Sequence, residues 1–206
     1  MLEKIVLLFI TIMAIIGILN YNDFFEKDMK YITIGRVKIY SVSNKAEILF
    51  LDESVGDRIR TLYNSSEPIF IFHGQAVGGK LKKDMYLEAA EENARGALSR
   101  FVETTVEIFQ QRIEVRTGMS LSKSAYRELI NLSSSSKQGG AKLIAAWMIP
   151  IDGIVYEYHG LLFYDPTMLA TMISQNELIK REIYKLNMQP KEFFEILNEA
   201  FKEAKP

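Results

Sequence analysis

The chain opens with a continuous apolar run, Ile5 to Leu19, which reads IVLLFITIMAIIGIL and carries no charge. As a helix this run would span about 22 Å, at about 1.5 Å per residue. A hydrocarbon core is roughly 30 Å thick, so neighbouring apolar and aromatic residues would have to extend the helix. The pattern predicts a membrane anchor within residues 1–25, formed by Ile5, Leu8, Phe9, Ile12, Ile15, Ile16 and Leu19.

Two other interpretations of this run stay open: a cleaved signal peptide and a buried core helix. A signal peptidase site needs small residues, and Ile18-Leu19-Asn20 does not supply them. A short N-terminal tail favours an extracytoplasmic (periplasmic) position for the rest of the chain. Basic residues after the run favour the opposite orientation, so a domain that faces the cytoplasm is an alternative. These basic residues are Lys27, Lys30, Arg36 and Lys38.

Short alternating patterns follow the apolar run and predict a small β-rich segment over residues 26–66. Residues 31–40 alternate as a strand does, and the alternation changes phase at Gly35-Arg36. Such a change indicates a bulge or a tight bend. Residues 45–52 contain AEILFLD, a second strand candidate, and residues 53–63 are expected to form a short helix.

The next segment, residues 67–165, predicts one long helix beside a small antiparallel sheet. A strand rich in β-formers covers residues 68–77, and a helix from 84 to 117 follows, with Gly118 as its expected C-cap. Small residues fill the first half of the apolar stripe on this helix, so Ala94 and Ala97 are expected to face the sheet. The stripe consists of Leu87, Ala90, Ala94, Ala97, Leu98, Phe101, Thr105 and Ile108.

After the long helix, the pattern predicts a short helix over residues 124–132 and a loop over 133–140. Two strands, 141–150 and 154–164, would then form a hairpin, because Asp152-Gly153 lies between them. Residues 166–206 are expected to form C-terminal helices, separated at Asn187 and opened again by Pro190.

The last of these helices has a one-sided apolar stripe, at the i, i+3, i+4, i+7, i+8 spacing. Such a stripe packs on its own domain or docks on a neighbouring subunit or partner, and the sequence leaves both interpretations open. The candidate interaction residues of the second interpretation are Phe193, Ile196, Leu197 and Phe201.

Composition narrows the classes of function. Hydrophobic residues make up 48% of the 206 residues. The formal net charge is −1, and a chain without a basic excess is not expected to bind nucleic acid. The absence of cysteine excludes disulfides, thiolate metal sites and a cysteine nucleophile. His73 and His159 lie on predicted strands and could meet across the sheet, but no acidic pair stands beside them at ligand spacing. We therefore predict no catalytic, cofactor-binding or metal-ligating residues and no enzyme activity.

A resemblance to a known family runs over about residues 68–165. The stretches GQAVGG, DMYLEAAEENARGALSRFVETTVEIF, AYRELINLSSSSKQGGAKLIAAWM and GIVYEYHGLLFYDP resemble the Lpp-twenty-like lipoprotein family, which includes FlgP-type flagellar disk lipoproteins. The pattern falls on Ala89, Ala90, Ala94, Arg95, Gly140, Ala141, Ile144, Trp147, Tyr156 and Tyr158. The resemblance implies a compact α+β domain of an envelope component that assembles into larger structures. The lipid-bearing cysteine of that family is absent here, and the N-terminal apolar helix would replace it.

Together these patterns predict an α+β fold: a small antiparallel sheet packed on one long helix, with an N-terminal membrane helix and C-terminal helices. The function we expect is non-enzymatic, in a membrane-anchored cell-envelope protein with an assembly or structural role, including association with the flagellum. Its partners would be the membrane and further copies of itself or another envelope protein, with no nucleic acid. The alternative is a small-ligand-binding or enzymatic envelope domain.

Overall fold

The computed structural model describes residues 29–204, with the backbone alone at residues 134 and 136–139. The predicted membrane anchor, residues 1–25 with Ile5, Leu8, Phe9, Ile12, Ile15, Ile16 and Leu19, lies outside the described residues. From residue 29 to residue 204, no helix combines the length and the apolar character needed to cross a membrane.

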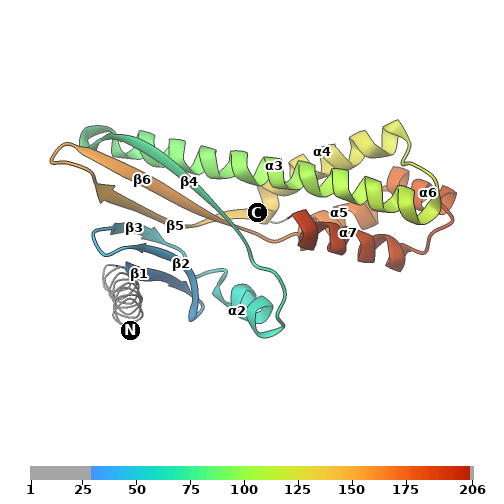
Figure 1. Cartoon of the computed structure of the whole chain (residues 1–206), viewed down its shortest axis with the longest axis horizontal. Coiled ribbons are helices and arrows are strands. Elements are labelled where there is room, and N and C mark those ends of the chain that lie inside the picture. Colours follow the sequence, from blue (N-terminus) through green and yellow to red (C-terminus); the bar gives the residue numbers. More distant parts are fainter. Residues whose placement is uncertain (1–28, 205–206) are drawn as a thin grey trace, which may run out of the picture.

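The fold is α+β, as the sequence predicts, and consists of antiparallel sheets and helices. A four-stranded antiparallel sheet has the order β3-β5-β6-β4, and β1 and β2 form a separate two-stranded hairpin. Figure 1 shows a sheet region and a helical region joined along one long helix, α3. The strands are β1 (Met29–Ile34), β2 (Val37–Ser43), β3 (Glu47–Leu51), β4 (Phe70–Gly79), β5 (Ala141–Pro150) and β6 (Val155–Tyr164).

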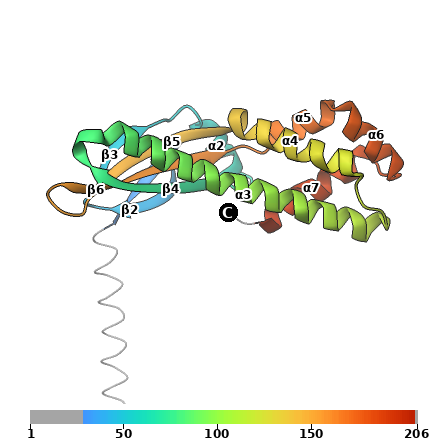
Figure 2. The ribbon, with the colours of Figure 1, turned by 90° about the horizontal axis from the view of Figure 1, so that it is seen from above.

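Seven helical elements complete the described chain, and Figure 2 shows α4 beside the second half of α3. The 35-residue helix α3 (Lys83–Thr117) begins one residue before the predicted start and ends, as predicted, before Gly118, whose φ of 69° is left-handed. The other helices are α2 (Gly56–Asn64), the 3-10 helix η1 (Lys80–Lys82), α4 (Lys123–Gly140), α5 (Thr167–Gln175), α6 (Glu177–Lys185) and α7 (Pro190–Ala204).

The first half of α3 lies very close to the sheet because both surfaces carry small residues. A Cβ atom built on Gly74 of β4 would lie 2.0 Å from the carbonyl oxygen of Ala90, and one on Gly160 would lie 3.3 Å from the backbone nitrogen of Glu91. Ala90 and Ala94 are fully buried here, and Ala97 is partly buried against the same core. The prediction that Ala94 faces the sheet is therefore confirmed, and Ala97 packs against the adjoining core.

Beyond the sheet, α3 continues into a helical bundle held by larger side chains. Phe109 of α3 packs edge-on against Phe193 of α7, with 4.8 Å between the ring centroids. Arg112 and Arg116 of α3 add ion pairs to carboxylates of α7. The bundle and the α3-facing side of the sheet share one continuous core, which includes Phe70, Phe72, Leu98, Phe101, Leu162, Tyr164, Leu169, Ile179 and Phe201.

The β1–β2 hairpin and α2 cover the opposite face of the sheet and enclose a second core. Gly35 and Arg36, where the sequence predicts a bulge or a tight bend, form the hairpin turn, and both have positive φ. Gly35 lies against the backbone of Gly56 at the start of α2, where a Cβ atom would meet the Gly56 oxygen at 2.1 Å. Arg58 of α2 binds Asp165 after β6 with a nitrogen–oxygen distance of 2.7 Å, and this pair fixes α2 to the end of the sheet.

One feature of the structure differs from the sequence-based expectations. Residues 133–140, expected to form a loop, continue α4 directly into β5. Serine is tolerated in a helix when its hydroxyl binds a carbonyl one turn back, as the Ser135 hydroxyl does with Asn131 at 3.0 Å. The described part of the segment expected to be β-rich, residues 29–66, contributes β1, β2, β3 and α2; β3 pairs with β5 in the main sheet, while β1 and β2 form their own hairpin.

Candidate functional site

The candidate interaction residues of the last helix lie in the interior of the chain. Phe193, Ile196, Leu197 and Phe201 all project from α7 into the main core and are almost completely buried. The stripe therefore packs on its own domain, which is the first of the two interpretations. It is buried because α3 presents a complementary row of large apolar residues, and this pairing of distant segments is not visible in the local sequence.

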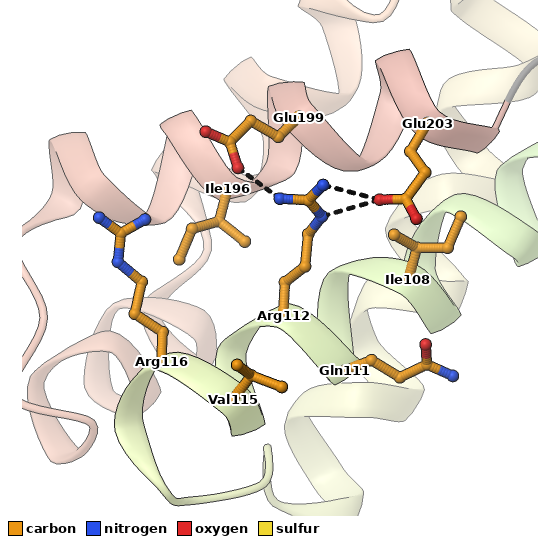
Figure 3. Close-up of a pocket in the computed structure, with 8 residues that line it drawn as sticks. All are labelled: Ile108, Gln111, Arg112, Val115, Arg116, Ile196, Glu199 and Glu203. Carbon is orange, nitrogen blue, oxygen red and sulfur yellow. Dashed lines mark hydrogen bonds and ion pairs between the residues drawn. The ribbon is translucent and has the colours of Figure 1, made fainter.

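A groove of about 450 Å³ remains open where α7 crosses the second half of α3 (Figure 3). Arg112 extends from α3 toward α7, and its guanidinium binds Glu199 at 2.5 Å and Glu203 at 2.7 Å. Arg116 binds Glu192 of α7 at 2.9 Å. The carboxylates of α7 thus hold both arginines, so the described residues that line this groove leave no unpaired cation to attract a ligand.

The edge strand β3 exposes three large apolar side chains at one side of the main sheet. Ile48, Phe50 and Leu51 are 39%, 43% and 44% exposed, and β3 is paired only with β5 within residues 29–204. An edge strand presents unpaired backbone groups that can pair with a strand of another chain. The edge of β3 therefore has both free backbone groups and exposed apolar side chains. A strand of another chain can use the first for hydrogen bonds and the second for apolar contacts.

The opposite edge strand, β4, is different because α3 covers part of it. The Asn93 side chain of α3 donates a hydrogen bond of 2.8 Å to the carbonyl oxygen of Gln75. A side-chain donor from the same chain thus occupies one of the carbonyl groups of β4. Of the two edges of the sheet, β3 is therefore the better candidate for an interaction with another chain.

The only two histidines and the only tryptophan of the sequence meet on the face covered by the hairpin. The His159 ring stacks on Trp147, with centroids 4.9 Å apart and an interplanar angle of 6°. A hydrogen bond of 2.9 Å joins His159 Nδ1 to His73 Nε2. Tyr40 of β2 completes the group, with its ring centroid 5.3 Å from that of His73.

We call Tyr40, His73, Trp147 and His159 the histidine cluster; its environment favours neutral imidazoles. Burial, together with the charge that His73 would carry, lowers the pKa of His159 to about 4. Burial also lowers the pKa of His73. A hydrogen bond between two imidazole nitrogens needs one donor and one acceptor, so the pair can form it only while at least one ring is neutral.

A cavity of about 150 Å³ adjoins the histidine cluster and extends to Ser41, Ser43 and Ile149. Two buried polar atoms of the cluster, Trp147 Nε1 and His159 Nε2, have no hydrogen-bond partner among the described residues. Glu157 approaches His159 Nε2 to 3.5 Å. A cavity of this volume is large enough to hold water or a small molecule. In the described part of the chain, no three His, Asp or Glu side chains are grouped as a metal site would require.

The sequence indicated part of this cluster, since it placed both histidines on strands that could meet. It missed Trp147 and Tyr40 as their partners. Trp147 lies on the hairpin-facing side because the pairing of β5 with β6 shifts between Leu143 and Ala145, and Tyr40 comes from a separate sheet. The only tryptophan of the sequence was the one feature that could have indicated this cluster. Which residues it contacts, however, depends on the shifted pairing of β5 with β6.

Comparisons with known proteins give no family for the chain. No protein-family model matches it, and no curated protein matches it either. Among solved structures, it is similar to the hypothetical protein FTT1539c from Francisella tularensis, at 10% identity and a TM-score of 0.25. The match covers 60% of this chain and 48% of that protein, so it spans about half the length of that relative. A likeness at this level carries no argument about function.

Proposed function

We propose that this protein is a non-enzymatic, membrane-anchored protein of the cell envelope that assembles with further copies of itself. The apolar run Ile5–Leu19 would hold the chain in the membrane, and the described domain would supply the contact between copies on the extracytoplasmic side. The resemblance of residues 68–165 to the Lpp-twenty-like family supplies the envelope context of this proposal, including a flagellar one. The edge strand β3 is the single observation that carries the assembly role.

Two copies of β3 could pair in antiparallel order and extend the sheet across a two-fold axis. Such pairing would satisfy the free backbone groups of both strands and bury Ile48, Phe50 and Leu51. Apolar burial contributes about 25 cal/mol per Å², so the side chains would add to the backbone hydrogen bonds. Cyclic dimers with a self-complementary contact are the commonest form of protein assembly.

The test compares the size of the full chain, extracted in mild detergent, with that of an edge variant. Phe50→Lys places a charge beside the free edge, and lysine is a residue that natural proteins use to block edge pairing. Val115→Lys is the matched control, because Val115 is 88% exposed on α3, far from β3.

We expect light scattering to show a dimer or larger species for the parent chain and for Val115→Lys, and a monomer for Phe50→Lys. Val115→Lys should keep the melting temperature of the parent chain, and Phe50→Lys should remain folded, since both substitutions are at exposed positions. A parent chain that stays monomeric at every concentration measured would contradict the proposal. An assembly that Phe50→Lys leaves unchanged would show that β3 is not the contact.

A second candidate function, small-ligand binding, is favoured by the cavity at the histidine cluster with its two unpartnered buried atoms. Trp147 is the only tryptophan and stacks on His159, so its fluorescence reports directly on this cavity. Zinc and copper ions, imidazole and inorganic phosphate are suitable probes of its chemistry. Saturable quenching that His159→Phe abolishes would support this function, and an unchanged spectrum with every probe would count against it.

A further inference from the structure

A group of exposed apolar side chains lies at the end of the sheet where β4 passes into α3 and β5 turns into β6. Leu81 is fully exposed, Ile154 is 78% exposed and Ile151 is 55% exposed. Val77 and Met85 are about half exposed at the same end. Leu81 lies in η1, and Ile151 and Ile154 lie in the turn between β5 and β6, while Val77 belongs to β4 and Met85 to α3. We call these five residues the apolar tip; the two turns lie at the left-hand end of Figure 1.

The two turns of the apolar tip are neighbours through the pairing of β4 with β6. Gly79, directly before η1, pairs with Val155, directly after Ile154. A Cβ atom built on Gly79 would lie 3.8 Å from the carbonyl oxygen of Ile154. The Lys80 ammonium lies 6.0 Å from the ring centroid of Tyr156, which also links the turns. Exposed apolar residues that occur singly need no explanation, but a contiguous group marks an interaction site.

Basic residues surround the apolar tip. Lys80, Lys82 and Lys83 occupy three of four consecutive positions around Leu81. The nearby acidic residues include Asp84, Asp152 and Glu157, which pairs with Val77 across β4 and β6. The Asp152 carboxylate accepts hydrogen bonds of 2.8 Å from the backbone of Ile154 and Val155. Asp152 therefore fixes the turn that presents Ile154. Apolar side chains next to lysines are typical of protein surfaces that enter the headgroup region of an anionic bilayer.

The N-terminal segment joins the domain at this same end. Met29, the first described residue, pairs with Ser43, and Ser43 lines the same cavity as Ile149 of β5. Because β5 ends at Pro150, directly before Ile151, the attachment point of residues 1–28 and the apolar tip lie at one end of the sheet. A chain held in a bilayer by its first residues would thus carry the tip close to the lipid surface.

We infer that the apolar tip is a second membrane contact, which inserts Leu81, Ile151 and Ile154 among anionic lipid headgroups and orients the domain on the bilayer. This inference rests on the membrane anchoring proposed above. It goes further, since an anchor alone would leave the domain free to tumble on its tether. With two contacts the long axis of the molecule takes a defined direction, with the helical region held away from the lipid.

The absence of cysteine from the sequence permits a direct test with single labelled sites in the full chain. Ile154→Cys and Leu81→Cys would each carry a nitrobenzoxadiazole dye, whose emission shifts to the blue in an apolar environment. Tyr184→Cys is the matched control, because Tyr184 is 85% exposed on α6, in the helical region. The labelled chains are reconstituted into vesicles of phosphatidylcholine and phosphatidylserine, with and without lipids that carry a quenching doxyl group.

We expect a blue shift and at least roughly twofold stronger quenching by doxyl lipid at Ile154 and Leu81 than at Tyr184. Omission of phosphatidylserine should reduce the difference, because the lysines then lose their anionic partners. Equal quenching at all three sites would overturn the inference. A blue shift without lipid quenching that grows with protein concentration would also overturn it, since the tip would then contact a second copy.

Carbonate extraction of the same vesicles separates this inference from the proposal on which it rests. If the full chain pellets with the vesicles and the tip is not quenched, the anchor stands and the tip contact alone is wrong. If carbonate releases the full chain, the proposed anchoring fails, and the inference falls with it.

Discussion

The two halves of α3 pack in opposite ways. Along the sheet, Ala90 and Ala94 lie against Gly74 and Gly160, and backbone approaches backbone so closely that no side chain fits between them. In the bundle, the same helix uses Phe109 and Ile113, which pack against the large residues of α7. In the sheet half the backbones are too close for one more carbon atom. In the bundle half the stability depends on large side chains that fill the space between the helices. The two halves should therefore respond to opposite kinds of substitution.

The largest effect is expected in the bundle, from the loss of a large side chain. Phe193→Ala removes a fully buried ring that contacts Phe109, and such deletions cost about 3–5 kcal/mol. Chemical denaturation would measure the change in the free energy of unfolding. Lys191→Ala, on the exposed side of the same helix, is the control and should change it by less than about 0.5 kcal/mol. Equal losses would mean that α7 is not docked as described.

A nearly equal effect is expected in the sheet half from the gain of one carbon atom. Gly74→Ala places a methyl carbon only 2.0 Å from the carbonyl oxygen of Ala90, and relief of this clash requires the backbone of α3 to move. We expect a loss of about 3 kcal/mol, at the upper end of overpacking costs, measured by thermal unfolding. A variant as stable as the parent would show that α3 lies farther from β4.

Acid is expected to lower the free energy of unfolding, because protonation of the histidine cluster disfavours the folded sheet half. The pKa of His159 is about 4 in the folded chain and about 6.5 when the chain is unfolded. The unfolded chain therefore binds protons more readily between these values, and stability falls as the pH decreases. From about pH 7 to about pH 5, the loss should be about 2 kcal/mol. His159→Phe should remove most of this dependence, and an unchanged pH profile would contradict the assignment.

The smallest effect is expected from a glycine of α3 that lies outside the tight contact. A Cβ atom on Gly96 would meet only the end of the Arg100 side chain, at 3.9 Å. Gly96→Ala should therefore stabilise the protein by about 1 kcal/mol, because alanine favours the helix. A loss of stability would show that the close approach extends to this face of α3.

Local patterns in the sequence were sufficient for most of the helices and strands. Asp152-Gly153 located the β5–β6 hairpin, Gly118 ended α3, and the apolar stripe gave the helix face correctly. These features depend on neighbours within a few residues. The pairing of β3 with β5, by contrast, joins Glu47 to Met148 across about half the chain, and no local pattern encodes it.

The same distinction applies to the candidate sites. The β3 strand could be found from its apolar residues, but its position at an edge depends on the order of the whole sheet. The stripe on α7 was visible, whereas its burial against α3 depended on tertiary packing. The apolar tip was hidden because Leu81 and Ile154 are isolated in the sequence and become neighbours only through the pairing of β4 with β6.

The length of α3 has a consequence for how the molecule unfolds. Its 35 residues span about 52 Å, and they contribute to the packing of the sheet region and of the helical region alike. Either region would have to release half of a continuous helix in order to open alone. We therefore expect slow and nearly uniform amide hydrogen exchange along α3, with both regions lost in one cooperative transition. Independent melting of the two regions would require a break in this helix near its middle.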